Sequence, residues 1–117
     1  MIDLEISKSL ALAIGHRVFN SAAVKDCWVW WHGVWRIFDY RDWSVIGPIA
    51  EKYSAFPSSI STGNFRKAKA QGYTDVRDWE VLMYDYRNGK EVSGAWKLTT
   101  AETPQKAIAL AVIGAMK

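Results

Sequence analysis

Residues 27–40 read CWVWWHGVWRIFDY, and we expect the rest of the chain to be organised around this aromatic stretch. Four of the seven tryptophans of the chain lie between residues 28 and 35. Two apolar runs meet at His32-Gly33, which has the length of a two-residue hairpin turn. Such a turn needs positive φ at both central positions, which glycine adopts freely and histidine tolerates better than most residues. The stretch therefore predicts a β-hairpin closed by His32 and Gly33.

The predicted hairpin is apolar on both faces. Directly opposed residues share a face, and one face is made of Trp28, Trp30, Trp35 and Ile37. We expect this face to rest on the core. The other face pairs Trp31 with Val34, Val29 with Arg36, and Cys27 with Phe38. Because a domain of this size seldom buries both faces of an antiparallel sheet, a helix, a second copy or a partner must cover the second face.

Three other segments have the apolar spacing of helices. The first runs from about Leu4 to Ile14, with Asp3 as its N-cap and Gly15 after its end. The second covers residues 43–53 and is capped by Asp42 or Ser44, although Gly47-Pro48 predicts a kink, or a helix that begins later with Pro48 in its first turn. The third follows Thr103 as N-cap and Pro104 in its first position. Its apolar stripe consists of Ile108, Ala111, Val112 and Ala115.

A second hairpin is predicted by Asn88-Gly89, a strong signal for a two-residue turn. Residues 79–87 and 90–99 form its strands. The register set by this turn places Val81 opposite Trp96 and Met83 opposite Gly94 on the core side. Before this hairpin we expect a polar loop over residues 54–63 and a short helix over residues 65–71.

These elements predict a single α+β domain spanning residues 1–117. The two hairpins form an antiparallel sheet packed with three helices, in the order α-ββ-α-ββ-α. The first and last helices both alternate small residues, so we expect them to pack on each other. A hydrophobic fraction of 50% and an aromatic fraction of 14% favour a packed globule over disorder.

The number of cysteines and the length of the apolar runs indicate the cellular compartment of the protein. A single cysteine excludes an internal disulfide and is typical of a reducing compartment. The N-terminus lacks the basic region of a signal peptide, and no apolar run reaches the length of a membrane span. We therefore expect a cytoplasmic protein with no membrane partner.

The net charge of +3 comes from one segment, residues 64–77, because the rest of the chain is balanced. Here aromatic and basic side chains alternate: Phe65, Arg66, Lys67, Lys69, Tyr73 and Arg77. Stacking combined with positive charge is how proteins hold single-stranded nucleic acid or nucleotides. The plainer interpretation is a solvated connecting loop, and it is the one we favour because charge runs usually face water.

Catalytic signatures are weak. Cys27 with His16 or His32 would be a nucleophile and its base, but a small buried strand residue is the better interpretation of Cys27. Asp26, Asp39 and Asp42 would form a carboxylate cluster, yet Asp39 and Asp42 fit a turn and an N-cap more simply. No ligand spacing with histidine and no phosphate-binding loop is present. We expect no catalytic residue, metal or cofactor.

Three parts of the chain resemble the NinX-like family of small tailed-phage and prophage proteins. They are a Leu-rich N-terminal helix (3–15), an aromatic-Asp segment running into Pro48-Ile49-Ala50 (36–53), and a late Pro before an Ala-Ile-Ala-rich helix (103–115). These parts make up somewhat under half of the chain, and residues 65–94 depart from the family's shorter pattern. The resemblance implies a phage origin, an infected bacterial host and an accessory role, and it carries over no functional residue.

The predicted function is therefore non-enzymatic protein binding, with a host protein, such as one of a defence system, or a phage protein as partner. The surface predicted to bind combines residues from both hairpins: Trp31, Val34, Arg36, Tyr84 and Tyr86. Tyr, Trp and Arg dominate protein interfaces. The plainer interpretation is that helices of the same chain cover this face. In a third interpretation, a second copy of the chain covers it in a symmetric homodimer. The alternative function is nucleotide or single-stranded nucleic-acid binding by residues 64–77.

Overall fold

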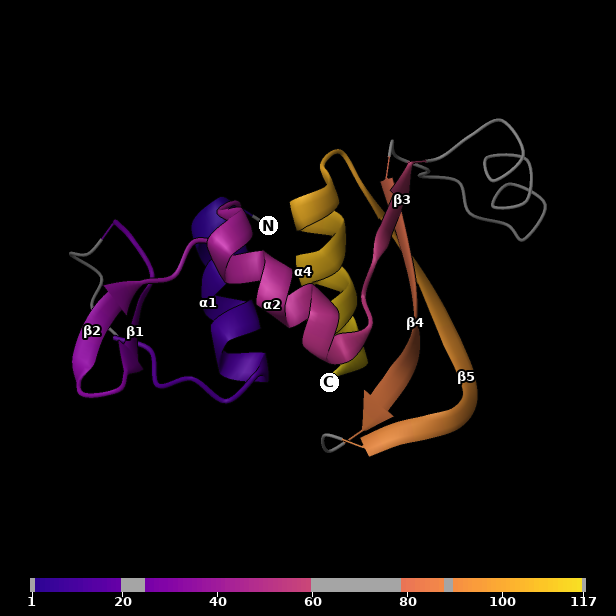
Figure 1. The fold of residues 1–117 in the computed structure, drawn as a ribbon, viewed down its shortest axis with the longest axis horizontal. Helices are drawn as coiled ribbons and strands as arrows, with labels where there is room; N and C mark the ends of the chain where they lie inside the picture. The colour runs from indigo at the N-terminus through magenta and orange to yellow at the C-terminus, as the bar shows by residue number, and fades with distance from the viewer. Residues whose placement is uncertain (1, 20–24, 60–78, 88–89, 117) are drawn as a thin grey trace.

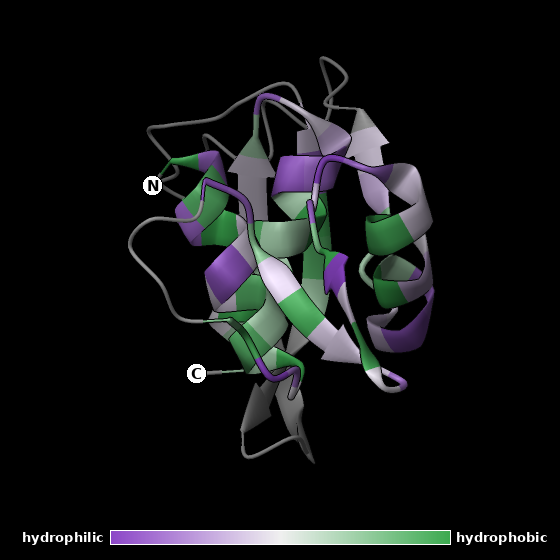
Figure 2. Cartoon of the chain, turned by 90° about the vertical axis from the view of Figure 1, so that its left-hand side faces the viewer, coloured by the Kyte–Doolittle hydropathy of each residue, from purple (hydrophilic) through white to green (hydrophobic). Residues whose placement is uncertain are grey.

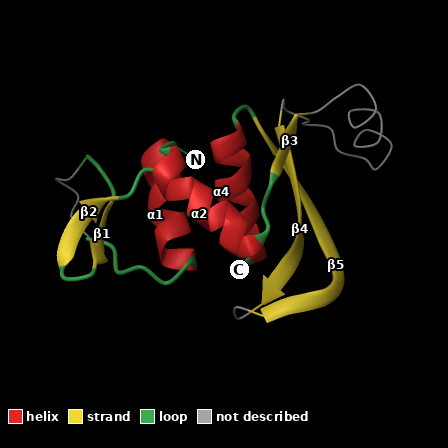
Figure 3. Cartoon of the chain, viewed as in Figure 1, coloured by secondary structure: helices red, strands yellow, loops and turns green. Residues whose placement is uncertain are grey.

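The computed structural model describes residues 2–19, 25–59, 79–87 and 90–116. The elements follow in the order α1 (Asp3–Ala13), β1 (Trp28–Trp31), β2 (Val34–Ile37), α2 (Trp43–Tyr53), β3 (Pro57–Ser59), β4 (Trp79–Arg87), β5 (Lys90–Ala101) and α4 (Pro104–Ala115). The chain is an α+β domain, as predicted, with helices between two groups of strands (Figures 1 and 3).

The two hairpins do not join into one sheet, which corrects the prediction of a shared sheet. In the described residues, β1 and β2 form a two-stranded sheet, whereas β3, β4 and β5 form a separate three-stranded sheet. The helices lie between them, with the β1–β2 hairpin at one end of the molecule and β4–β5 at the other (Figure 1). β3 lies where a polar loop was expected, because Pro57–Ser59 pair with Trp79–Val81 of β4.

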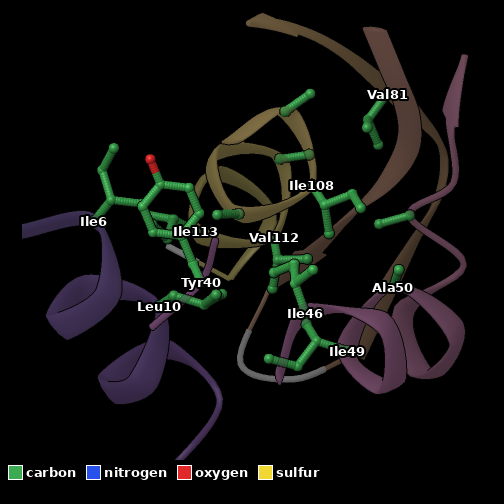
Figure 4. Packing of buried hydrophobic residues seen from close by; sticks show 14 of the residues in the cluster. Ile6, Leu10, Tyr40, Ile46, Ile49, Ala50, Val81, Ile108, Val112 and Ile113 are labelled. Atoms are coloured by element: carbon green, nitrogen blue, oxygen red, sulfur yellow. The ribbon is translucent and has the colours of Figure 1, made fainter. Parts of the chain in front are cut away.

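Helix α4 occupies the centre of the core. Its predicted stripe is buried, and Ile108 and Val112 are among the largest fully buried side chains. Ile6 and Leu10 of α1, Ile46 of α2 and Val81 of β4 belong to the same cluster (Figure 4). The expected packing of the first helix on the last is therefore confirmed. None of the helices in the described ranges is long and apolar enough to cross a membrane.

The helix termini follow the predicted caps, with one exception. The Asp42 side chain accepts a hydrogen bond from the Ser44 N–H, and Thr103 does the same for Lys106. Helix α2 begins at Trp43, so Pro48 lies inside the helix beyond its first turn, and the alternative of a later start is wrong. The prediction of Asp3 as an N-cap is also wrong. Ile2 is the N-cap of α1 and makes no side-chain cap, and the Asp3 carboxylate instead accepts a hydrogen bond from the Tyr40 hydroxyl.

The second hairpin keeps its predicted register only near the turn. Tyr86 lies opposite Glu91, but an irregularity between Tyr84 and Tyr86 shifts the pairing from there on. Val81 lies opposite Thr99 rather than Trp96, and Met83 opposite Lys97 rather than Gly94. Val81 and Met83 are nevertheless buried as predicted. A bulge moves the partner strand without turning β4 over.

Candidate functional site

The β1–β2 hairpin has the predicted geometry. Trp28 pairs with Ile37, Val29 with Arg36, Trp30 with Trp35, and Trp31 with Val34. His32 has φ +46° and Gly33 φ +86°, so both central turn residues adopt positive φ. This matches the right-handed twist of two antiparallel strands joined by a two-residue turn. The turn chemistry therefore fixes which side chains share a face.

The hairpin is connected to α1 by a well-defined helix end. The Gly15 N–H donates to the Leu12 carbonyl and the His16 N–H to the Ala11 carbonyl. These two bonds form a Schellman motif, and Gly15, with φ +91°, supplies its left-handed residue. His16 follows directly, with its ring 5.1 Å from Trp31 and 5.6 Å from Phe38 between ring centroids. The end of α1 thus places an aromatic contact against the hairpin.

The next residues extend the hairpin by a short stretch of pairing. The Phe19 N–H donates to the Trp28 carbonyl and the Trp30 N–H to the Arg17 carbonyl, both at 2.9 Å. Val18 and Val29 form the corresponding antiparallel bridge. Residues 17–19 therefore lie along the outer edge of β1, and β2 lies on its other side.

A polar cluster fixes the exit of the hairpin. The Tyr40 N–H donates to Ser7 Oγ at 3.1 Å, and the buried Tyr40 ring places its hydroxyl against the Asp3 carboxylate. Arg41 forms ion pairs with Asp39 at 2.7 Å and with Asp3 at 3.3 Å. Hydrogen bonds from Arg41 hold the pKa of the Asp39 carboxyl below its usual range. Burial and the bond to Asp3 raise the pKa of Tyr40.

The structure corrects the prediction of which hairpin face rests on the core. The inner face (Cys27, Val29, Trp31, Val34, Arg36 and Phe38) points toward the helices. The outer face consists of Trp28, Trp30, Trp35 and Ile37. Val29 is only 3% exposed, whereas Trp30 is 41% and Ile37 52% exposed. The reason is the entry of the chain: His16 contacts Trp31 and Phe38, which are both on the inner face.

Rings on the outer face pack against each other instead of against the core. The ring centroid of Trp35 lies 5.4 Å from that of Phe19 and 5.3 Å from that of Trp30, and both ring pairs are packed edge to face. The Arg17 guanidinium lies over the Trp35 ring at 5.9 Å. Edge-to-face pairs and cation–π contacts stabilise such a cluster by about 0.5–1.5 kcal/mol each. The cluster holds large aromatic surface in place while leaving much of it exposed to solvent.

The tip of the inner face is exposed as well. Trp31 is 43% and Val34 48% exposed, and Arg36 is exposed between them and the core. Figure 2 looks onto this end of the molecule, with the hairpin nearest the viewer. Exposed large apolar side chains that gather on one element are characteristic of binding surfaces.

A groove of about 420 Å³ separates the inner face of the hairpin from α2. Its hairpin wall includes Trp31, Arg36 and Phe38, and its helix wall includes Val45 and Ile49. The groove is mostly apolar, as small binding sites usually are. His16 also lines the groove. Its pKa is lowered by burial and by the nearby charge of Lys52, so the imidazole is neutral near pH 7.

Two of the predicted binding residues lie elsewhere. Tyr84 and Tyr86 are on β4, in the other sheet, so the structure does not bring them onto one face with Trp31, Val34 and Arg36. The helices separate the two groups (Figure 1). The basic-aromatic residues Phe65, Arg66, Lys67, Lys69, Tyr73 and Arg77 lie outside the described residues, so nucleic-acid or nucleotide binding stays a prediction.

The residues considered for catalysis have structural roles. Cys27 is buried, and burial raises the pKa of its thiol, which opposes a reactive thiolate. Asp42 caps α2, and Asp39 pairs with Arg41. Asp26 and Asp39 line a small hollow of about 90 Å³ together with Lys25 and Arg41. Within the described ranges, no three His, Cys, Asp or Glu side chains are grouped to hold a metal ion.

Sequence reasoning identified one side of the groove and missed the other. Trp31, Val34 and Arg36 were predicted for a binding surface. Val45, Pro48 and Ile49 of α2 were not, because their place beside the hairpin depends on how residues 38–42 turn the chain. Gly15-His16 directly after an apolar helix was an available signal for the His16 contact.

The comparisons with known proteins found no matching family model, no matching curated protein and no matching solved structure. The resemblance to the NinX-like family therefore rests on the three quoted sequence segments and stays a prediction.

Proposed function

We propose that this chain is a non-enzymatic accessory protein that binds another protein through the β1–β2 hairpin. The observation that carries the proposal is the exposure of Trp30, Trp31, Val34 and Ile37 on one small hairpin at the end of the molecule. Tryptophan contributes a large apolar area with few rotatable bonds, and it is enriched among the residues that dominate binding energy. The mutual packing of Phe19, Trp30 and Trp35 limits the entropy lost when a partner covers them.

The setting of this function follows from the sequence resemblance. The resemblance to the NinX-like family supports a phage origin and an accessory role. The proposed setting is then the cytoplasm of an infected bacterium, and the proposed partner is a host protein, such as one from a defence system, or a phage protein. The free thiol of Cys27 is buried in the core and agrees with a reducing compartment.

The test is capture of a partner from lysate of a bacterial host by the immobilised protein, followed by affinity measurement with that partner after purification. The test variants are Trp30→Ala and Trp31→Ala. The matched control is Phe56→Ala, which removes an exposed aromatic ring after α2, outside the hairpin. We expect the hairpin variants to weaken binding by roughly tenfold or more, as for other interface aromatics, and the control to bind like the wild type.

Salt dependence separates this proposal from binding to phosphate. Apolar contacts change little between low and physiological salt, whereas contacts to nucleic acid weaken steeply. The proposal fails if the captured partner binds both hairpin variants as tightly as the wild type. It also fails if the partner is a nucleic acid that salt releases.

A further inference from the structure

Strand β2 lies at the edge of its sheet, and its backbone pattern shows which groups point outward. In an antiparallel pair, opposed residues alternate between pairs that exchange hydrogen bonds and pairs that do not. Trp28 and Trp30 direct their backbone groups away from β2, toward Phe19 and Arg17. Their opposed residues on β2 are Ile37 and Trp35. Trp35 and Ile37 therefore direct their N–H and C=O groups away from β1, while Val34 and Arg36 bond to β1.

No described residue takes a backbone hydrogen bond from the outward groups of Trp35 or Ile37, or gives one to them. Two donors and two acceptors thus stand in a row at the spacing of a strand. Such an edge is a ready template for pairing with an extended segment of another chain. Trp35 is half-buried and Ile37 exposed, so an added strand gains apolar contact on the outer face as well.

The groove gives the added strand a second wall. Arg36 and Ile37 of β2 line it from one side, and Val45, Pro48 and Ile49 of α2 from the other. An extended segment beside β2 points every second side chain to the inner face, where this groove lies. The remaining side chains point to the outer face, beside Trp35 and Ile37.

Charge selects the side chains of the segment. Arg36 is exposed, lines the groove and forms no ion pair with a described residue. Burial lowers the pKa of the neighbouring His16, so its imidazole adds no positive charge near pH 7. The Asp42 carboxylate also lines the groove, but it is the N-cap of α2, where the helix dipole and the bonds from the Ser44 N–H and hydroxyl offset part of its negative charge. On the outer face, Arg17 adds a second positive charge above Trp35. An inward-pointing side chain across from Arg36 is therefore best acidic, and its neighbours across from Trp35 and Ile37 are best apolar.

We propose that the partner contributes an extended segment with an acidic residue across from Arg36 and apolar residues across from Trp35 and Ile37, which adds to the β2 edge as a strand and lies against α2. This inference rests on the proposed binding function and specifies the chemistry of the partner. A second copy of the chain fits less well. Twofold antiparallel pairing of Trp35 with Ile37 would place two Arg36 side chains opposite each other, and like charges in that position are destabilising.

The test uses two synthetic peptides of about eight residues, a common strand length. One alternates valine with glutamate, and the other alternates valine with lysine. Amide hydrogen exchange of the full chain is followed by NMR with and without each peptide. We expect the glutamate peptide to slow exchange at Trp35 and Ile37 by at least about tenfold, with little change at Val34 and Arg36, whose amides are already bonded to β1. The lysine peptide should have no such effect.

Variants at one position test the charge assignment. The Arg36→Glu variant should no longer bind the glutamate peptide and should bind the lysine peptide instead. The Arg36→Lys variant keeps the positive charge and should still bind the glutamate peptide in preference to the lysine peptide. The unchanged exchange pattern of α4 in each variant shows that the fold is intact.

Three results would overturn the inference: neither peptide protects Trp35 and Ile37, both peptides protect them equally, or the two amides are already protected by self-association without a peptide. In each case, a captured partner that still depends on Trp30 and Trp31 would leave the proposed function standing. Loss of that dependence as well would remove both.

Discussion

The two hairpins of this chain differ in apolar content and in their surroundings, and the more apolar one is the less buried. β4 and β5 lie against α4, and Val81 and Met83 of β4 are buried in the core. The β1–β2 hairpin is richer in tryptophan, yet it lies at the opposite end and exposes rings on both faces. It is held mainly by its entry at His16–Phe19 and its exit at Phe38–Arg41. The position of a helix, rather than the apolar content of a strand, therefore decides whether an apolar side chain becomes core or surface.

The largest effect is expected in the helical core. Ile108→Ala removes a fully buried side chain from α4 and leaves a cavity in the hydrophobic core cluster. The free energy of unfolding should fall by about 2–5 kcal/mol, measured by urea denaturation. Leu12→Ala, at an exposed position of α1, is the matched control and should change it by no more than about 0.5 kcal/mol. Equal losses at the two positions would mean that α4 is not the centre of the core.

A smaller change in the free energy of unfolding is expected from alanine substitutions at two glycines, and the two changes should have opposite signs. Gly33→Ala places a side chain at φ +86° in the hairpin turn, where strain rather than crowding opposes it. We expect a loss of about 1–2 kcal/mol in the free energy of unfolding. Gly47→Ala in α2 meets nothing within 4 Å and should raise that free energy by up to about 1 kcal/mol, because alanine favours helix. The same sign for both substitutions in thermal denaturation would contradict the assigned turn.

A smaller effect tests how the hairpin exit is held. Tyr40→Phe keeps the buried ring and removes only the hydroxyl that donates to Asp3. The free energy of unfolding should fall by about 1 kcal/mol, the usual net value of one hydrogen bond. Asp3→Asn in the Tyr40→Phe background should then cost less than Asp3→Asn in the wild type. Additive losses in this double-mutant cycle would show that the two groups do not interact.

The smallest effect concerns pH. Burial lowers the pKa of His16 from its ordinary value of 6.5. The unfolded chain therefore binds a proton more readily, and this contribution to stability is present above pH 6.5 and is lost as the pH falls toward the folded-state pKa. His16→Gln should flatten the decline in stability between about pH 7 and pH 5. Identical pH profiles for the variant and the wild type would place His16 in solvent, away from Trp31.

Much of the fold was predictable because short-range chemistry fixes it. His32-Gly33 set the register of the first hairpin, Asp42 and Thr103 marked two helix starts, and Gly15 ended the first helix. The pairing of β5 with β4 was predictable only near the turn, because an irregularity between Tyr84 and Tyr86 shifts the register that the Asn88-Gly89 turn predicts. The orientation of the first hairpin was also not predicted, because both of its faces are largely apolar, and the contacts of the inner face with His16 and its place beside α2 are tertiary features.

The candidate site was predicted in part for the same reason. Trp31, Val34 and Arg36 share a face through local strand alternation, which sequence reveals. Joining them to Tyr84 and Tyr86 required knowing whether two hairpins share a sheet, and the helices between them prevent it. The wall that α2 contributes to the groove is likewise a tertiary feature.

The most direct test of the account is hydroxyl-radical footprinting of the free protein, read by mass spectrometry at concentrations where light scattering shows a monomer. Trp43 on α2 is exposed and serves as an internal standard of the same residue type, while buried Tyr40 marks full protection. The account predicts that Trp30 and Trp31 are modified about as fast as Trp43. Protection of both tryptophans to the level of Tyr40 would show that the molecule covers its own hairpin, and would contradict a docking role for it.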